Sequence, residues 1–149
     1  MNVWAIANQK GGVGKTTTAI TLAGVMHNRG HRVLLIDLDP HGSLTSYFRL
    51  DPDDVEPSVY DLFHKTAEPQ SVVRKTGFER ISFLPASTAL ATLDRQLGTK
   101  DGMGLVIKKT LDQLKNDFEY VLIDCPPMLG LLMVNALAAC DRLLIPVQH

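Results

Sequence analysis

Residues 10 to 17 decide the fold, and they read Lys10-Gly11-Gly12-Val13-Gly14-Lys15-Thr16-Thr17. This glycine-rich run follows an apolar segment typical of a buried strand, Val3–Ala7, and leads into a helical pattern. Closely spaced glycines let the backbone turn sharply and approach a ligand closely. The N–H groups and the dipole at the start of the following helix favour an anion. The run therefore predicts a phosphate-binding loop.

The loop departs from the common P-loop pattern, G-x-x-x-x-G-K-[ST], at its entrance. Gln9 occupies the position of the first glycine, and Lys10 adds a second lysine. In the common pattern the lysine at the place of Lys15 neutralises phosphate charge, and the hydroxyl at the place of Thr16 meets Mg²⁺. We therefore expect nucleotide phosphates to be bound by Lys10, Gly11, Gly12, Val13, Gly14, Lys15, Thr16 and Thr17.

The composition is that of an ordinary soluble α/β protein. The chain has 149 residues, enough for one domain, with 45% hydrophobic residues and 15 basic against 16 acidic side chains. This balance excludes a net positive electrostatic field over the whole chain, which would favour binding to nucleic acid or to an anionic membrane. We read no signal peptide and no apolar stretch of membrane-spanning length. Cys125 and Cys140 lack metal-ligand spacing and favour a reducing cytoplasm.

Continuous apolar runs alternate with helical patterns along the chain. Helical spacing follows the glycine loop, at Ala19, Leu22, Ala23 and Met26, and recurs at Ile107, Leu111 and Leu114. Continuous rather than alternating apolar runs indicate buried parallel strands. The predicted fold is thus a doubly wound, mostly parallel sheet with helices on both faces. The expected strands are Val3–Ala7, Val33–Ile36, Ile81–Leu84, Tyr120–Ile123 and Leu143–Val147, and Asp51–Pro57 is expected to be a solvated acidic loop.

Two of the expected strands end in acidic residues. Asp37 and Asp39 follow the second strand, and Asp124 follows the fourth. Ligands of open α/β sheets bind beyond the carboxyl ends of the strands. There, one carboxylate can hold Mg²⁺ and another can orient or deprotonate an attacking water. A lone aspartate of this kind more often caps a turn, but two such strands beside a phosphate loop favour a site.

The motifs taken together resemble one family. Lys10–Thr17, the Asp37-x-Asp39-Pro40-x-Gly42-Ser43 run and the Asp124-x-Pro126-Pro127 run are similar, in order and spacing, to the deviant-P-loop ATPases of the ParA/MinD family. Within that family the chain most resembles the ParA (Soj) partition branch. The stretch Asp37–Phe48 is similar to ParA-like proteins encoded with chemotaxis and flagellar genes. Two residues depart from the family pattern: His41 stands where glutamine is usual, and Cys125 where threonine is frequent.

The resemblance implies a role for each site residue. Lys15 would bind the β- and γ-phosphates, and Thr16 and Asp124 would hold Mg²⁺, directly and through water respectively. Asp39 would position the attacking water, and Asp37 would support the metal shell. The implied activity is hydrolysis of ATP to ADP and phosphate, with ATP and Mg²⁺ bound.

Lys10 is similar to a signature lysine that reaches into the partner subunit's nucleotide, so the resemblance implies an ATP-dependent homodimer and a catalytic role for Lys10 across it. It also implies an activating partner, ParB-like or a cargo adaptor, and a cytoplasmic protein at the nucleoid or a pole that positions DNA or a protein cargo. Family members usually continue for about another hundred residues. We therefore expect residues 1–149 to be the N-terminal part of one P-loop ATPase domain, poorly active alone, with nonspecific DNA binding supplied by the remainder.

Two other functions stay open. One is an ATP-dependent ligase or amidase of the dethiobiotin synthetase type, which shares the deviant loop but contacts a small molecule after the second and fourth strands. The other is a non-catalytic nucleotide-binding protein or an Mrp-like iron–sulfur carrier, whose cluster cysteines would have to lie beyond residue 149.

Overall fold

The computed structural model describes residues 1–8, 13–98 and 100–146. The strands are β1 (Asn2–Ile6), β2 (Val33–Asp37), β3 (Arg74–Lys75), β4 (Ile81–Leu84), β5 (Tyr120–Asp124) and β6 (Arg142–Leu144). The α-helices are α1 (Val13–Asn28), α2 (Ser43–Tyr47), α3 (Val59–Phe63), α4 (Pro69–Val72), α5 (Leu93–Leu97), α6 (Val106–Leu114) and α7 (Leu131–Ala139). Two 3-10 turns, η1 (Thr88–Thr92) and η2 (Met103–Leu105), precede α5 and α6.

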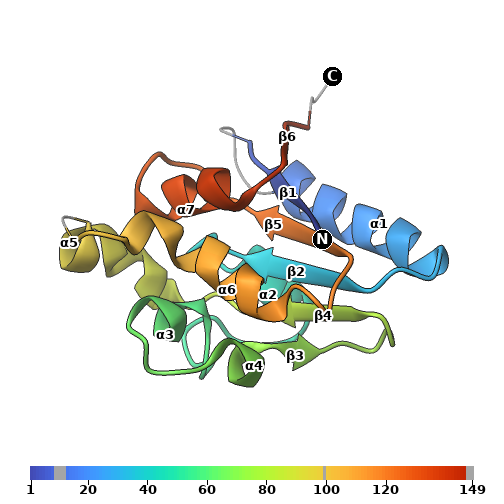
Figure 1. Ribbon diagram of the computed structural model, residues 1–149, viewed down its shortest axis with the longest axis horizontal. Helices are drawn as coiled ribbons and strands as arrows, with labels where there is room; N and C mark the ends of the chain where they lie inside the picture. The colour runs from blue at the N-terminus through green and yellow to red at the C-terminus, as the bar shows by residue number, and fades with distance from the viewer. Residues whose placement is uncertain (9–12, 99, 147–149) are drawn as a thin grey trace.

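The strands form one sheet in the order β3-β4-β2-β5-β1-β6 (Figure 1). All neighbouring pairs are parallel except the edge pair β3 and β4. The predicted doubly wound, mostly parallel sheet is therefore confirmed. Strand β3 was not predicted, because its two residues are polar and carry no apolar run. The last strand lies at Arg142–Leu144 rather than at the predicted Leu143–Val147, and Val147 is outside the described residues.

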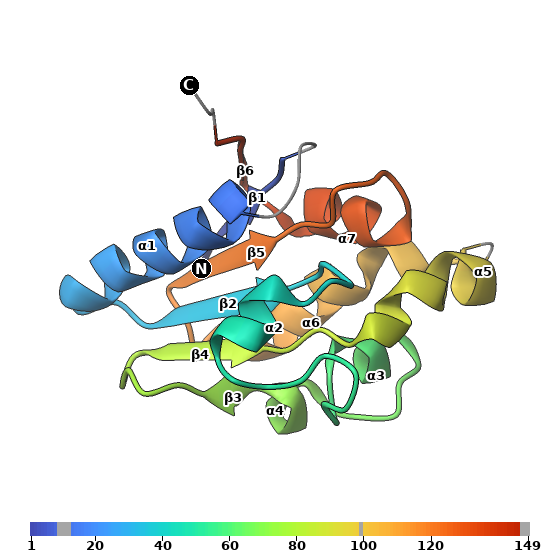
Figure 2. The ribbon, with the colours of Figure 1, turned by 180° about the vertical axis from the view of Figure 1, so that it is seen from behind.

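Helices cover both faces of the sheet. Figure 2 shows α1 and α2 on one face, and Figure 1 shows α6 and α7 in front of the other. On the first face, Ala19 and Ala23 of α1 pack in one core cluster with Leu35 of β2. The apolar positions of α6 that the sequence spacing predicted, Ile107, Leu111 and Leu114, are buried on the opposite face. Because both faces are covered, all five residues of β2 are buried, as its unbroken apolar run predicts.

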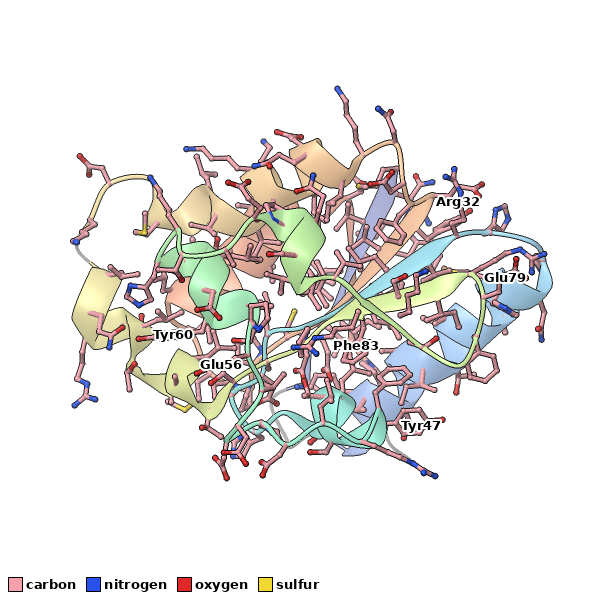
Figure 3. The ribbon with its side chains drawn as sticks, turned by 90° about the horizontal axis from the view of Figure 1, so that it is seen from below. Arg32, Tyr47, Glu56, Tyr60, Glu79 and Phe83 are labelled. Atoms are coloured by element: carbon pink, nitrogen blue, oxygen red, sulfur yellow. The ribbon has the colours of Figure 1, made fainter. Side chains whose placement is uncertain are left out.

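The two ends of the sheet differ in what they expose. Arg32 and Glu79 precede β2 and β4 and lie together at one end of the molecule, far from Tyr60 (Figure 3). This is the end at which the strands begin, so the carboxyl ends of the strands lie at the opposite end. The acidic stretch 51–57 forms turns there with mostly exposed residues, as predicted. No helix in the described part of the chain is long and apolar enough to cross a membrane.

Candidate active site

The carboxyl ends of the central strands bring the predicted acidic residues together. Strand β5 lies between β1 and β2, and its register places Asp124 opposite Asp37 on one side and Ile6 on the other. The backbone N–H of Leu38 donates to the carbonyl of Asp124 at 2.9 Å, which extends this pairing past the strand. Helix α1 follows β1 and carries Lys15 and Thr16 in its first turn.

The side chain of Lys15 is enclosed by acidic groups. Only 1% of Lys15 is exposed, and its Nζ lies 2.9 Å from Asp39 Oδ2 and 3.1 Å from Asp124 Oδ1. The ammonium also donates to the backbone carbonyl of Cys125. Burial lowers the pKa of Lys15, but the carboxylates of Asp124 and Asp39 outweigh it, so this pKa lies above the ordinary lysine value. Lys15 is therefore held as a buried cation.

Thr16 and Asp124 form the second contact of the site. The Thr16 hydroxyl donates to Asp124 Oδ2 at 2.8 Å. Asp124 is fully buried, and its Oδ1 accepts no hydrogen bond from any residue that the structure describes, although it faces the Lys15 ammonium. Burial raises the pKa of Asp124 above its ordinary value, although Lys15 and Thr16 stabilise the charged form. One hydroxyl and one carboxylate match the few protein ligands that Mg²⁺ takes beside phosphate.

A metal cage made of protein alone is absent from the described ranges, in which no three His, Cys, Asp or Glu side chains are grouped to hold a metal ion. The arrangement around Thr16 thus fits a metal that completes its shell with phosphate oxygens and water, as Mg²⁺ does in nucleotide sites.

Asp39 is held from both sides. Its Oδ2 pairs with Lys15, while its Oδ1 accepts the backbone N–H of His41 at 3.0 Å and lies 3.0 Å from His41 Nδ1. Burial raises the pKa of Asp39, yet the hydrogen bonds from Lys15 and His41 outweigh it and hold this pKa below its usual value. The carboxylate is therefore charged and fixed in orientation. His41, which departs from the family pattern, contacts it directly.

Asp37 lies beneath Asp39 and faces the protein interior. Its Oδ2 accepts the backbone N–H and the hydroxyl of Thr45 at 2.9 and 2.7 Å, and its Oδ1 accepts the backbone N–H of Asp39 at 3.1 Å. Burial and the charge of Asp124 raise the pKa of Asp37 to about 7, against the effect of these three donors. Both of its oxygens stabilise the turn after β2, and its support of a metal shell stays a prediction.

A glycine fixes the turn that carries Asp39. Gly42 has a φ of 67°, and its N–H donates to the carbonyl of Asp39 at 2.8 Å. A Cβ at this position would lie 2.4 Å from Cγ of Pro52. Residues with side chains rarely adopt this φ, so both backbone conformation and space require glycine here. The acidic loop around Pro52 thereby packs against the turn of the site.

Part of the predicted loop lies outside the residues that the structure describes. Lys10, Gly11 and Gly12 lie outside the described residues, and of Val13 only the backbone is described, as the first residue of α1. Gly14 follows it in the helix, and its carbonyl accepts the Thr18 hydroxyl at 2.6 Å. Thr17 is exposed. Thr45 belongs to the stretch Asp37–Phe48 that carries the resemblance, but the sequence predicts no role for it in the site, although its hydroxyl contacts Asp37. Its signal is a threonine two residues after the Gly42-Ser43 pair.

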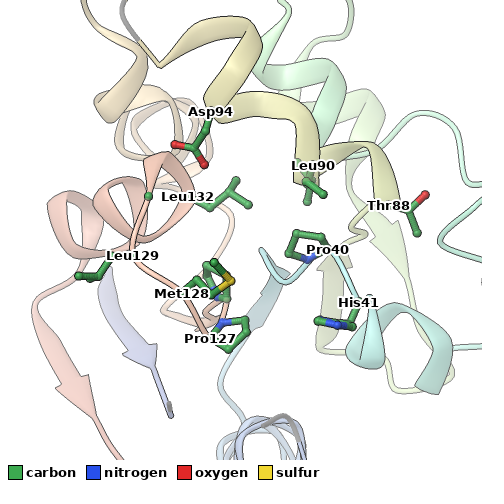
Figure 4. Close-up of a pocket in the computed structure, with 12 residues that line it drawn as sticks. Pro40, His41, Thr88, Leu90, Asp94, Pro127, Met128, Leu129 and Leu132 are labelled. Atoms are coloured by element: carbon green, nitrogen blue, oxygen red, sulfur yellow. The ribbon is translucent and has the colours of Figure 1, made fainter. Parts of the chain in front are cut away.

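A cavity of about 540 Å³ opens beside the site. Figure 4 shows His41 and Pro40, from the turn after β2, facing it together with Pro127 and Met128 from the loop after β5. The other walls come from η1, α5, the loop before α7 and the start of α7: Thr88, Leu90, Ala91, Asp94, Leu129 and Leu132. The cavity is largely apolar and adjoins the Asp39 carboxylate through His41.

Comparison with known proteins agrees with this geometry. A protein family described as an AAA domain matches residues 1–149. The chain belongs to this family. This chain is 42% identical over 144 residues to the sporulation initiation inhibitor protein Soj of Bacillus subtilis. It is 38% identical over 143 residues to the chromosome partitioning protein ParA of Myxococcus xanthus. These matches cover 97% and 96% of this chain, and the inferred resemblance to the ParA and Soj branch is confirmed.

A solved structure also superposes closely on this chain. It is that of a cobyrinic acid a,c-diamide synthase from Mycobacterium smegmatis with a bound ATP analogue and magnesium, with a TM-score of 0.93 and 40% identity over 99% of this chain. The chain spans 57% of the length of Soj, 50% of that of ParA and 60% of that of the synthase.

Proposed function

We propose that this chain carries the phosphate-handling half of a Mg-ATP-dependent ATPase of the Soj and ParA type, which hydrolyses ATP to ADP and phosphate. The observation that carries the proposal is the position of Lys15, whose ammonium lies within 2.9 and 3.1 Å of the carboxylates of Asp39 and Asp124. A buried lysine at the start of α1, beside a threonine hydroxyl and two strand-end carboxylates, is the set of groups that phosphoryl transfer uses.

Each group has a chemical task in this proposal. The Lys15 ammonium binds the β- and γ-phosphates of ATP, where it neutralises charge as the bond to the leaving group breaks. Thr16 and, through water, Asp124 would hold Mg²⁺, which supplies further positive charge to the phosphate oxygens; the magnesium in the M. smegmatis structure supports this assignment. Asp39 orients the attacking water, and Asp37 supports this arrangement from below.

The Lys15 pairs imply an exchange of partners when ATP binds. Phosphate oxygens compete with Asp39 and Asp124 for the same ammonium, and they carry more charge than a carboxylate. Once Lys15 binds phosphate, Asp39 loses its cationic partner and keeps the N–H of His41. Its Oδ2 is then free to accept a proton of the attacking water.

The proposed dimer depends on Lys10. A second lysine at the loop entrance, acting on the nucleotide of a second copy, would make ATP part of a two-fold contact, so that association depends on the nucleotide state. An activating partner of the ParB or cargo-adaptor kind would then trigger hydrolysis. The name of the M. xanthus chromosome partitioning protein ParA supports chromosome partitioning as the process, with DNA or a protein assembly as the cargo.

A second candidate is an ATP-using synthase or amidase that acts on a small molecule. Two observations favour it: the similarity to the M. smegmatis synthase, and the cavity of about 540 Å³ that adjoins Asp39 through His41. In that function ATP would activate a carboxyl group of the bound molecule, and hydrolysis without the molecule would be slow.

Phosphate release from Mg-ATP by the purified, complete protein separates the two. We expect release without any added small molecule, its loss in EDTA, and its loss in Lys15→Ala. Sedimentation should show a dimer with ATP and a monomer with ADP. Turnover that appears only when a carboxylic acid and an amine donor are supplied would favour the synthase instead.

A further inference from the structure

A buried hydrogen-bond relay joins the ends of β2 and β4 beneath the site. Thr45, in the first turn of α2, is fully buried, and its hydroxyl lies between Asp37 and the start of the segment after β4. The hydroxyl donates to Asp37 Oδ2 at 2.7 Å and accepts the backbone N–H of Ala86 at 2.8 Å. The N–H of Thr45 donates to the same oxygen of Asp37 at 2.9 Å.

The relay continues to the acidic residue that faces Lys15. The second oxygen of Asp37, Oδ1, accepts the backbone N–H of Asp39 at 3.1 Å. The Asp39 carboxylate then pairs with Lys15 at 2.9 Å. Asp37 is fully buried and Asp39 is 3% exposed, so water does not compete for the hydrogen bonds of this relay.

The centre of the relay needs a group that both donates and accepts. The Thr45 hydroxyl donates to Asp37 and accepts from Ala86 at once, which neither a methyl nor an ammonium group can do. Valine has nearly the shape of threonine, but it would leave the buried N–H of Ala86 without an acceptor and take one donor from Asp37. Buried backbone N–H groups are almost always paired, so the turn would shift to regain a partner.

The relay also links Asp39 to a wall of the neighbouring cavity. Ala86 lies two residues before η1, and Thr88 and Leu90 of η1 line the cavity together with His41. His41 in turn contacts the Asp39 carboxylate. Thr45 therefore keeps η1 and the turn of Asp39 at a fixed distance from each other.

The geometry points to Thr45 as a positioning residue for hydrolysis: through Asp37 it fixes the backbone of Asp39, and with it the carboxylate that orients the attacking water. This inference rests on the proposed ATPase function. It assigns Thr45 no contact with the nucleotide, so its loss lowers the rate of the chemical step and leaves nucleotide binding intact. Small displacements of a catalytic group can cost of order a hundredfold in rate.

The test compares three variants of the complete protein. Thr45→Val removes the hydroxyl at nearly constant shape, and Thr45→Ser keeps the hydroxyl. Thr110→Val makes the same change at a buried threonine of α6, whose hydroxyl donates to Val106 within that helix at 2.9 Å. We expect Thr45→Val to lower kcat between about tenfold and a hundredfold, with the Kd for ATP within about threefold of the wild type. Thr45→Ser and Thr110→Val should keep kcat within about threefold.

Amide hydrogen exchange followed by NMR provides a readout that does not depend on turnover. In Thr45→Val the Asp39 amide should exchange at least about tenfold faster than in the wild type, whereas Thr110→Val should leave it unchanged. If the wild type releases no phosphate, the proposed function fails, and the exchange rate of Asp39 still decides whether Thr45 positions it.

Three results would overturn the inference: a wild-type kcat in Thr45→Val, an equal loss in Thr45→Ser and Thr45→Val, or unchanged protection of the Asp39 amide. Should Thr45→Val not fold, Thr45→Ala and Thr45→Ser make the same comparison, because both side chains are smaller than threonine and only serine keeps the hydroxyl.

Discussion

Lys15 and Asp39 form a buried ion pair, with 2.9 Å between Nζ and Oδ2. The two residues have opposite tasks in the proposed reaction, because one binds phosphate and the other orients water. Their pairing keeps both side chains charged and ordered while no phosphate is bound. ATP binding would then transfer Lys15 to phosphate and release one oxygen of Asp39, so that the water-orienting group becomes available only when substrate is present.

Removal of the lysine should destabilise the protein. In Lys15→Ala two buried carboxylates lose their cation, and breaking a buried pair in this way typically costs about 3 kcal/mol or more. The lowered pKa of Asp39 contributes stability above its unfolded pKa, near 4, and this contribution is lost as the pH falls through the lower folded pKa. The difference in the free energy of unfolding between wild type and Lys15→Ala should therefore be largest at neutral pH and shrink below about pH 4.

Urea unfolding at several pH values measures this effect, with Lys108→Ala, at an exposed lysine of α6, as the matched control. A Lys15→Ala protein as stable as the control at neutral pH would contradict a stabilising role of the pair.

Asp37 should give stability the opposite dependence on pH. Burial raises its pKa to about 7, so the folded state binds the proton more tightly than the unfolded state does. The stability that this proton provides is complete below the unfolded pKa, near 4, and is lost as the pH rises through 7. A shift of this size corresponds to roughly 4 kcal/mol.

Asp37→Asn should remove the loss of stability that the wild type shows as the pH rises from 4 to about 7. Thermal or urea unfolding across this range tests it, and Asp112→Asn, at an exposed aspartate of α6, is the control. If wild type and Asp37→Asn show parallel stability curves, Asp37 is ionised throughout and its three donors outweigh its burial.

Lys10 should act on the partner's nucleotide and not on its own. We expect Lys10→Ala to keep ATP binding to the monomer and to lose both the ATP-dependent dimer and hydrolysis, because the resemblance to the family's signature lysine implies that Lys10 acts on the nucleotide of a second copy. Light scattering with ATP measures the association, and Lys75→Ala, at an exposed lysine of β3, is the control. Equal dimerisation by Lys10→Ala and wild type would exclude the role across the interface.

The fold was readable from the sequence where burial is strongest. The run Val33–Ile36 has no polar residue, and the structure buries both of its faces, so its strand could be placed within one residue. Strand β3 and the short helices α2 to α5 gave no comparable signal, because four or five residues are too few for a helical period. The polar pair Arg74 and Lys75 joins the sheet only because β4 offers a free edge.

The site was readable because its chemistry needs particular residues at fixed places. Lys15, Thr16 and the strand-end aspartates follow from the glycine loop and from the rule that parallel strands end at one edge of the sheet. The inward orientation of Asp37 and its contact with Thr45 could not be predicted, because they depend on how α2 folds back under the turn. The same holds for His41, whose contact with Asp39 depends on the conformation of the turn that carries both residues.

The most direct test of the account is phosphate release from saturating Mg-ATP by Asp39→Ala, measured beside its affinity for ATP. Removal of the carboxylate takes away the group that orients water but leaves Lys15, Thr16 and Asp124 in place. We predict a loss of turnover of about a hundredfold or more, an ATP affinity within about threefold of the wild type, and a persistent ATP-bound dimer. Asp53→Ala, at an exposed aspartate of the acidic loop, should behave as the wild type. Wild-type turnover in Asp39→Ala, or a loss of affinity as large as the loss of turnover, would contradict the account.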